Sequence, residues 1–422
     1  MWTASTLAAS IAITITMGCA HGPAVVAGPS TARGRPPTDA ELGFVRHVAS
    51  RVEQLRSLRY RTPVQVRVIT AEGLLLEGLA GSDDERHLRM ARRLHAVGLT
   101  HDPGTTVSAW ARMRGSAASF YDSEADCIML LEEALRLGLQ ERHVQAEAHL
   151  AHELTHALSA QHFGWAGGRQ RPRSGLEMER RRALRMILEG EAELVQALYL
   201  AEARGVDPLA VLRSESSRNV DLVQGDSGFG RQADAYVRQE QFANYAYGLA
   251  FIQLVWRQRS WQGVDAVFRS PPSSTEQVLH PEKYFSRENP VEVTIPISPA
   301  LRDAGYRRVD AGCLGELEAA VFFGRERDDL DFRAAGGWAG DAGEIYESPS
   351  GEAASVWISR WDDVAEAEEA EGAARALASH LPGGAAHNAV ARRGVTLLVV
   401  QGLDEPLLSE VVRELLATES LR

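Results

Sequence analysis

The sequence predicts an α+β protein with two folded units: a mainly helical domain with a small β-sheet over residues 39–288, and a small α+β domain over residues 289–422. Three observations support this. The chain of 422 residues is too long for one ordinary hydrophobic core. Long segments with helical periodicity dominate the part before residue 289. After it, short strand patterns alternate with helical ones.

The N-terminal segment is typical of an exported chain. Residues 1–18 carry no charged side chain, and their apolar run has the length of a signal-peptide core rather than of a membrane span. Cys19 follows a glycine, as in the cleavage box of bacterial lipoproteins, so we expect lipidation at Cys19 and a place in the cell envelope, in the periplasm or at the cell surface. Residues 19–38 are rich in Gly, Pro and Ala and are predicted to be a flexible tether.

Charge and cysteine content narrow the remaining classes. The net charge of −12 leaves no basic footprint for a phosphate backbone, so we expect no nucleic-acid partner. In an oxidising compartment Cys127 and Cys313 could form one disulfide that ties the two halves of the chain together. The alternative is two buried thiols that act as small hydrophobic groups. The sequence leaves this choice and the oligomeric state open.

In the first domain the periodicity predicts helices and strands in a mixed order. Valines at positions 64, 66 and 68 alternate with polar residues, which indicates a half-buried strand. Two short apolar runs around a polar turn indicate a β-hairpin. The predicted helices span residues 39–58, 82–97, 141–161 and 175–204, and the hairpin joins residues 119–122 to 127–131.

The second domain shows a different pattern, with strands expected at residues 344–346 and 354–361, a helix over 363–380, a strand pair around Arg393 and a closing helix. The acidic residues at the start of the 363–380 helix interact favourably with the helix dipole at its N-terminus. This interaction accounts for their presence without a metal or partner site.

A His-Glu-Leu-Thr-His sequence from His152 to His156 lies inside the helix predicted over residues 141–161. Residues four apart on a helix lie one turn apart on nearly the same face, so both imidazoles can bind a single metal ion. Glu153 projects beside them and, as a general base, can take a proton from a zinc-activated water. The pattern therefore predicts a Zn²⁺ site that catalyses hydrolysis.

Two residues could supply the third ligand. His162 stands where the pattern HExxHxxGxxH has its third histidine, but Ser159 occupies the glycine position at which the chain must turn sharply. Glu189 lies on the next predicted helix and would complete a His, His, Glu set with one open position. Glu193, one turn further, could then accept a hydrogen bond from a ligating histidine. The choice of Glu189 over Glu193 rests on Gly190, which follows Glu189. The alternative without a metal is that both glutamates are solvated helix residues.

Three segments resemble the gluzincin clan, and within it bacterial, often lipid-anchored, neutral zinc metallopeptidases: HELTHALSAQHF (residues 152–163), LEGEAEL (188–194) and PPSSTEQVLHPEKY (271–284). The resemblance covers about residues 55–284. It implies a zincin-like fold for the first domain, peptidase activity, and Glu189, the first glutamate of the EGxA motif, as the metal ligand. Ser159 and Ala160 stand where relatives tend to have glutamine and aspartate.

Peptide hydrolysis also needs a donor for the oxyanion, which HExxH does not supply. His280, in a polar loop, is either such a donor or an exposed capping histidine. Tyr245 shares a helix face with Gly248 and is either a donor or a core residue. The arginines within residues 180–185 form solvated ion pairs or recognise an acidic substrate group. The strand at residues 119–121 either belongs to a buried hairpin or pairs with an extended peptide.

Together these patterns predict a zinc-dependent metallopeptidase that acts on a peptide or protein and contacts a membrane through the lipid at Cys19. The main alternative is a non-catalytic zinc-binding envelope lipoprotein with a role in binding or assembly. A further alternative is hydrolysis of a non-peptide amide, such as a cell-wall cross-link. Glu153 favours catalysis, because a structural zinc site has no use for a general base and normally closes its fourth position.

Overall fold

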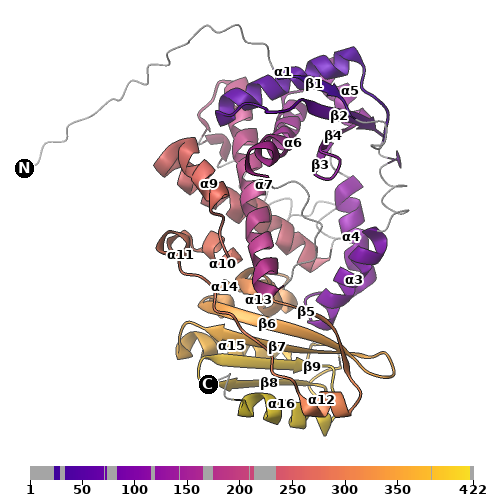
Figure 1. The fold of residues 1–422 in the computed structure, drawn as a ribbon, viewed down its shortest axis with the longest axis vertical. Helices are drawn as coiled ribbons and strands as arrows, with labels where there is room; N and C mark the ends of the chain where they lie inside the picture. The colour runs from indigo at the N-terminus through magenta and orange to yellow at the C-terminus, as the bar shows by residue number, and fades with distance from the viewer. Residues whose placement is uncertain are drawn as a thin grey trace, which may run out of the picture.

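The computed structural model describes residues 23–28, 34–70, 72–73, 83–115, 119–141, 143–164, 174–208, 210–212, 234–381 and 383–418. Its architecture is mixed α+β, with two small sheets, as the sequence predicts. In Figure 1 a helix-rich upper part stands on a lower part built around the second sheet. The predicted signal segment and Cys19 lie outside the described residues. Among the described helices, none combines the length and apolar character that a bilayer crossing needs.

Long helices form the centre of the upper part. They are α1 (Asp39–Arg56), α6 (Val144–Phe163), α7 (Gly175–Arg204) and α9 (Ala235–Arg269), with the shorter α5 (Glu132–Glu141) at one side. Apolar side chains of α1, α6, α7 and α9 meet those of the first sheet in one continuous core. The predicted helix over residues 175–204 is confirmed at both ends, because Ser174 caps its first turn and Gly205 ends it in the left-handed conformation.

The first sheet has the strand order β1-β2-β4-β3. Its strands are β1 (Val25–Ala27), β2 (Val64–Ile69), β3 (Ser119–Asp122) and β4 (Cys127–Leu131). The predicted strand at the alternating valines and the predicted hairpin are both confirmed, since β3 pairs antiparallel with β4. β3 lies at one edge of the sheet, directly beside α6.

The prediction of a flexible tether over residues 19–38 is wrong for its described part. β1 pairs in parallel with β2, Arg35 forms a bridge to Val68, and Thr38 caps α1 through a capping box with Glu41. Two adjacent valines at positions 25 and 26 are enough to extend a sheet whose edge would otherwise be unpaired. The glycines and prolines around them obscured this short strand in the composition.

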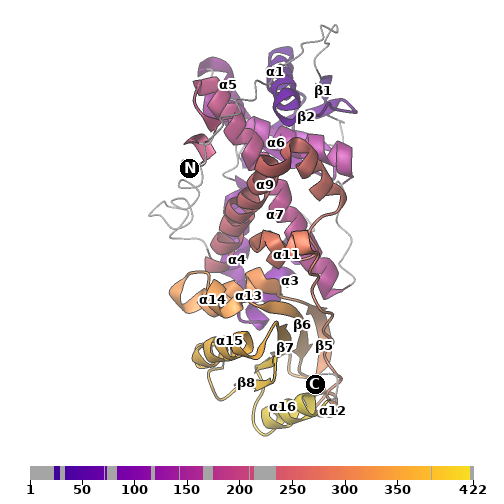
Figure 2. The same ribbon diagram turned by 90° about the vertical axis from the view of Figure 1, so that its left-hand side faces the viewer.

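The second sheet is antiparallel throughout, in the order β5-β6-β7-β9-β8. Its strands are β5 (Arg307–Gly312), β6 (Trp338–Glu347), β7 (Ala353–Trp361), β8 (Asn388–Arg393) and β9 (Thr396–Gln401). Alternate residues of β7 point to opposite faces. Trp357 packs with α13 (Gly315–Gly324) and α15 (Val364–Leu377), whereas Val356 and Ile358 pack with α12 (Pro299–Asp303) and α16 (Leu407–Ala417). Helices thus cover both faces, as the turned view shows (Figure 2).

The two parts share a hydrophobic core, which the predicted division at residue 289 does not imply. Leu94 and Val97, at the end of α3 (Asp83–Ala96), and Ala109 of α4 (Pro103–Gly115) belong to the same buried cluster as Trp338 and Trp357 of the second sheet. In Figure 1 α3 reaches down toward that sheet, with α4 beside it. Residues from the first third of the sequence therefore complete the core of the C-terminal unit.

The segment PPSSTEQVLHPEKY forms a joint between the two parts. It contains α10 (Thr275–Leu279) and the first four residues of α11 (Pro281–Ser286). The backbone N–H of Thr275 donates to Glu179 of α7 at 2.6 Å. Lys283, the only lysine in the chain, lies among three carboxylates: its Nζ is 2.6 Å from Glu276, 2.7 Å from Glu288 and 2.7 Å from Asp362, which follows β7.

A partly buried arginine paired with a buried glutamate strengthens this joint from the other side. Arg182 of α7 donates to Glu318 of α13 at 2.7 Å and to the carbonyl oxygens of Cys313 and Leu314. Breaking such a pair would leave an unpaired buried charge, which costs about 3–5 kcal/mol. The joint therefore holds α7 in a fixed place relative to the second sheet.

Two carboxyls of the joint should make the protein less stable as the pH rises. Burial raises the pKa of Glu179 and of Glu276 to about 7, above the ordinary 4.5. A carboxyl with a raised pKa in the folded state stabilises the fold most below its unfolded pKa, and this contribution is lost as the pH rises through 7. We expect the free energy of unfolding of the chelator-treated protein to fall by about 1 kcal/mol per carboxyl between pH 6 and pH 8.

The matched variants are Glu276→Gln and, on the exposed side chain of α11, Glu282→Gln. The first should show a smaller fall in denaturant-unfolding free energy over this interval, and the second should follow the wild type. An equally steep fall in Glu276→Gln would contradict the assignment of the effect to this carboxyl.

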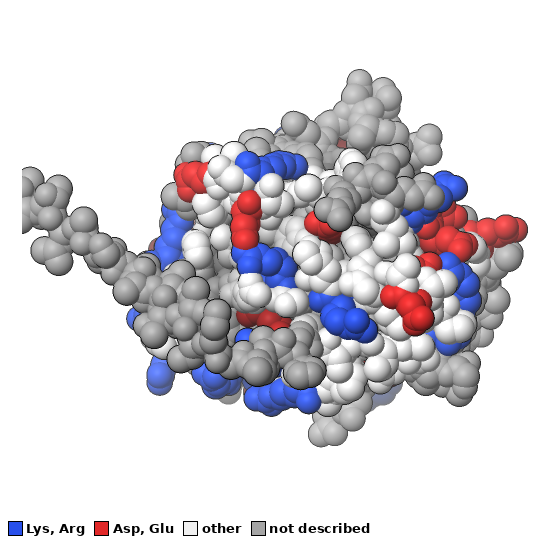
Figure 3. All heavy atoms as spheres, turned by 90° about the horizontal axis from the view of Figure 1, so that it is seen from above, with Lys and Arg blue, Asp and Glu red and all other residues white. Residues whose placement is uncertain are grey.

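Cys127 and Cys313 are free and buried, so the disulfide considered from the sequence is absent and the alternative of two buried thiols holds. On the surface seen from above in Figure 3, blue and red side chains of the described residues are scattered over a largely uncharged face.

Candidate metal centre

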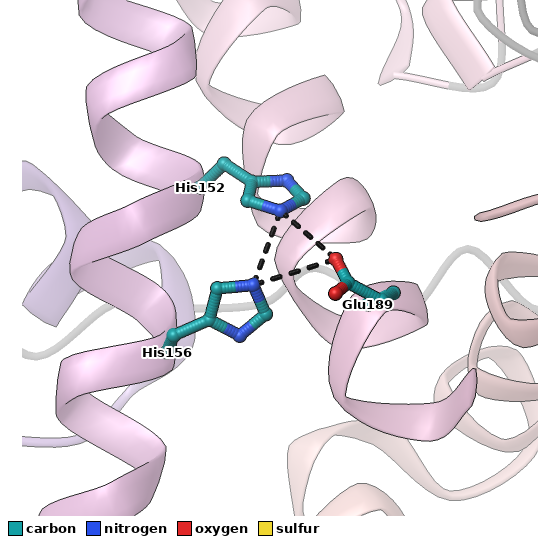
Figure 4. A group of neighbouring side chains, drawn as sticks. All are labelled: His152, His156 and Glu189. Carbon is teal, nitrogen blue, oxygen red and sulfur yellow. Dashed lines mark hydrogen bonds and ion pairs between the residues drawn. The ribbon is translucent and has the colours of Figure 1, made fainter. Parts of the chain in front are cut away.

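Three side chains from two helices converge at the centre of the upper part. His152 and His156 project from α6, and Glu189 projects toward them from α7 (Figure 4). The two Nε2 atoms are 3.1 Å apart. Oε2 of Glu189 lies 3.3 Å from Nε2 of His152 and 3.5 Å from Nε2 of His156. The two Nε2 atoms and Oε2 of Glu189 thus surround one common position, where a metal ion could be bound by all three.

These distances fit a tetrahedral metal ion. Zinc ligands at about 2.0–2.1 Å from the metal in tetrahedral geometry lie about 3.3 Å from one another. The three observed separations bracket that value. Two imidazole nitrogens and one carboxylate oxygen are also a donor set that zinc prefers, and three protein ligands leave a fourth position open.

The charges of the three residues depend on one another. Although burial disfavours the ionised form, the imidazoles of His156 and His152 hold the pKa of Glu189 well below its usual range. Glu189 is therefore a carboxylate and not an acid, which is the form that ligates a metal.

Glu193 lies where the sequence predicts a supporting group. Its Oε1 is 3.3 Å from Nδ1 of His152, within ion-pair distance although outside the angular range of a direct hydrogen bond. A carboxylate on the second nitrogen of a metal-binding histidine fixes the ring and its tautomer. Glu189 and Glu193 thus contact opposite nitrogens of the same imidazole, and the structure brings Glu189 to the cluster formed by both histidines.

Glu153 lies beside the cluster without joining it. Its Oε2 accepts a hydrogen bond from the backbone N–H of Tyr121 on β3 at 2.9 Å. Burial raises its pKa, and the neighbouring imidazoles act in the opposite sense. A carboxylate held in place by a strand and less acidic than usual is suited to accept a proton and release it again.

Tyr245 also lies at the centre. Its ring stacks on that of His152, with centroids 6.0 Å apart and the planes at 30°. The negative charge of Glu189, together with burial, raises the pKa of Tyr245 well above its usual value, so its hydroxyl stays protonated and can donate. Of the two donors considered from the sequence, Tyr245 is the one that contacts the cluster.

Two glycines place α7 and α9 close enough for this contact. A Cβ atom on Gly248 would lie 2.0 Å from the carbonyl oxygen of Met186, and one on Gly190 would lie 2.1 Å from the carbonyl oxygen of Gly248. The helices therefore cross with their backbones in contact. Glu189 directly precedes Gly190, and Tyr245 precedes Gly248 by less than a turn. The helix crossing therefore sets the positions of Glu189 and Tyr245.

The other histidine candidates lie elsewhere. Nε2 of His280 is 2.8 Å from buried Glu316 of α13, in the joint between the two parts, so its contacts do not support the prediction of a donor at the metal cluster. The prediction of a polar loop around His280 is wrong, because residues 275–279 form α10, and His280 stands between α10 and α11 against α13 of the C-terminal unit. His162 contacts the carbonyl oxygen of Arg59 at 2.7 Å and is not part of the cluster, which agrees with the preference for Glu189.

Sequence reasoning missed a buried network on the opposite face of α7. Arg56, fully buried at the end of α1, pairs with Glu191 and with Asp265 and lies 4.5 Å from the ring centroid of Trp261. Glu191 also accepts from Ser159 of α6. Ser159, three residues after His156, thus joins α6 to α7 near the metal-binding residues. The only signal was a glutamate within an apolar helical stretch.

The comparisons with known proteins concern only the C-terminal unit. A family model described as a domain of unknown function (DUF8575) matches residues 304–412, about a quarter of the chain, from before β5 into α16. No curated protein matches the chain, and no solved structure does.

Proposed function

We propose that this chain is a zinc-dependent metallopeptidase with a zincin-like first domain, in which His152, His156 and Glu189 hold Zn²⁺ and Glu153 is the general base. The observation that carries the proposal is the convergence of two Nε2 atoms and one carboxylate oxygen at 3.1–3.5 Å, with a further carboxylate beside them. When bound there, zinc would lower the pKa of a water and polarise the scissile carbonyl.

The remaining steps belong to the side chains of the chain itself. Glu153 takes the proton of the attacking water and delivers it to the leaving amine, while the N–H of Tyr121 keeps the carboxylate oriented. The hydroxyl of Tyr245, in a ring stacked on His152, donates to the oxyanion that develops on the former carbonyl oxygen.

The edge strand β3 offers a place for the substrate backbone. Its inner side pairs with β4, and the N–H of Tyr121 points the other way, toward Glu153. An extended peptide added along that outer side would pass the general base and the metal. This arrangement favours a peptide over a compact non-peptide amide as the substrate.

Exchange of Glu189 for alanine is the direct test of the metal set. Removing one of three protein ligands should abolish stoichiometric zinc in the purified protein after dialysis against a weak chelator, measured by elemental analysis. The matched control is Glu202→Ala, which changes an exposed glutamate in the last turns of the same helix and should retain zinc.

Digestion of a pooled peptide library by the zinc-loaded wild type then separates the possible functions. Cleavage supports the peptidase. Stoichiometric zinc without cleavage of any peptide would favour the non-catalytic envelope lipoprotein, and release of fragments from purified peptidoglycan alone would favour the non-peptide amide. Retention of zinc by Glu189→Ala would contradict the proposed site.

A further inference from the structure

Arg185 lies beside the candidate metal centre. It precedes Glu189 by four residues on α7, so the two side chains lie one turn apart on the same face of the helix. The carboxylates of Glu240 and, more weakly, Glu189 raise the pKa of Arg185. In turn, the charge of Arg185 acts on Tyr245. The guanidinium therefore belongs to the electrostatic surroundings of the site.

The guanidinium of Arg185 makes one hydrogen bond through a single nitrogen. Its Nη1 donates to Oε1 of Glu240 on α9 at 3.0 Å, and 46% of the Arg185 side chain is exposed, against 20% for Glu240. Among the residues that the structure describes, none accepts a hydrogen bond from Nε or Nη2 of Arg185. Glu240 thus fixes the side chain and leaves one edge of the planar fork free for a second acceptor.

The neighbouring arginines on α7 are used differently. Arg181 pairs with Glu177 on its own helix at 2.6 Å. Arg182 points into the joint and donates to Glu318. Of these three arginines, Arg185 is the one within about one turn of Glu189, whereas Arg182 lies two turns away with its guanidinium engaged in the joint. The three arginines that cluster in the sequence therefore make three separate sets of contacts. Arg185 is the one that lies near the candidate metal centre.

We propose that Arg185 binds a carboxylate of the substrate close to the scissile bond. This inference rests on the proposed function and names a specificity determinant for it. A carboxylate accepts two parallel N–H bonds from the edge of a guanidinium, a match in geometry and charge that a neutral amide lacks. An acidic side chain and a free C-terminus both present this group.

Four zinc-binding probes test the proposal and separate the two sources. They are peptide hydroxamates ending in Leu-Glu or Leu-Gln, each with either a free C-terminal carboxylate or an amide. Dissociation constants are measured by calorimetry for the zinc-loaded full chain and for Arg185→Gln, Arg185→Lys and the matched control Arg181→Gln, with zinc content checked in each.

The wild type should bind at least one carboxylate probe about tenfold or more tightly than the neutral Leu-Gln amide, the range of a charge-assisted pair. Preference for Glu over Gln identifies the side chain as the source, and preference for the acid over the amide identifies the C-terminus. Arg185→Gln should lose the preference to within about twofold, Arg185→Lys should keep part of it, and Arg181→Gln should retain it.

Equal binding of all four probes by the wild type would overturn the role of Arg185 and leave the metallopeptidase proposal intact. A preference that persists in Arg185→Gln would do the same. If the zinc-loaded protein bound none of the probes, the open coordination position would be refuted, and the peptidase proposal would fall together with this inference.

Discussion

Exchange of Glu153 for glutamine is expected to leave the zinc content unchanged and to lower the kcat for peptide cleavage by about 10²–10⁴-fold, the usual worth of a general base. Glutamine has the same shape and can still accept the N–H of Tyr121, so the fold and the ligands are preserved. It lacks the ability to take up a proton at neutral pH. The measurement is initial-rate cleavage of a peptide found in the library digest, with zinc determined in the same preparation.

The comparison with Gln161→Glu makes the result specific. Gln161 lies two turns further along α6 and contacts the backbone of Arg61 and Thr62, outside the metal cluster. This variant changes charge on the same helix and should retain turnover within a few-fold. If Glu153→Gln cleaved peptide at the wild-type rate, another group would have to be the base.

Exchange of Gly248 for alanine should both destabilise the protein and weaken zinc binding. The added methyl would lie 2.0 Å from a backbone oxygen of α7, so the helices must separate, and overpacking of this kind typically costs about 1–3 kcal/mol. Separation would move Glu189 and Tyr245 away from His152. Zinc affinity should therefore fall at least about tenfold, because a ligand held for tetrahedral geometry tolerates little displacement.

Gly372→Ala is the matched control for this prediction. Gly372 lies within α15, and a Cβ there would meet nothing within 4 Å. Alanine should stabilise that helix slightly, since glycine loses more backbone entropy on folding. Denaturant unfolding and competition with a zinc indicator measure both quantities. Wild-type zinc affinity in Gly248→Ala would show that the helix crossing does not set the geometry of the centre.

The local structure around the candidate site that the sequence predicts correctly depends on spacing along the chain. The four-residue interval between His152 and His156 fixes their common face once a helix forms, and Gly205 marks the end of the helix that carries Glu189. The hairpin of β3 and β4 is equally local. In each case the residues that cause the structure are neighbours in the chain.

The parts that the sequence did not predict depend on partners far away in the chain. Nothing near His280 indicates that its ring pairs with Glu316, and nothing near Glu191 identifies Arg56 as its partner, 135 residues earlier. The packing of α3 against the second sheet is of the same kind. These contacts depend on charge and burial that exist only in the folded arrangement of the long helices.

Lys283 gives the molecule a single side-chain amine that a reagent can modify. Besides the α-amino group, this ammonium is the only primary amine in the sequence, and it is enclosed by carboxylates from both structural units. An acylating reagent needs the uncharged amine, which these ion pairs suppress. The rate of acylation at this one nitrogen therefore reports how often these ion pairs open, and a single mass shift is enough to follow it.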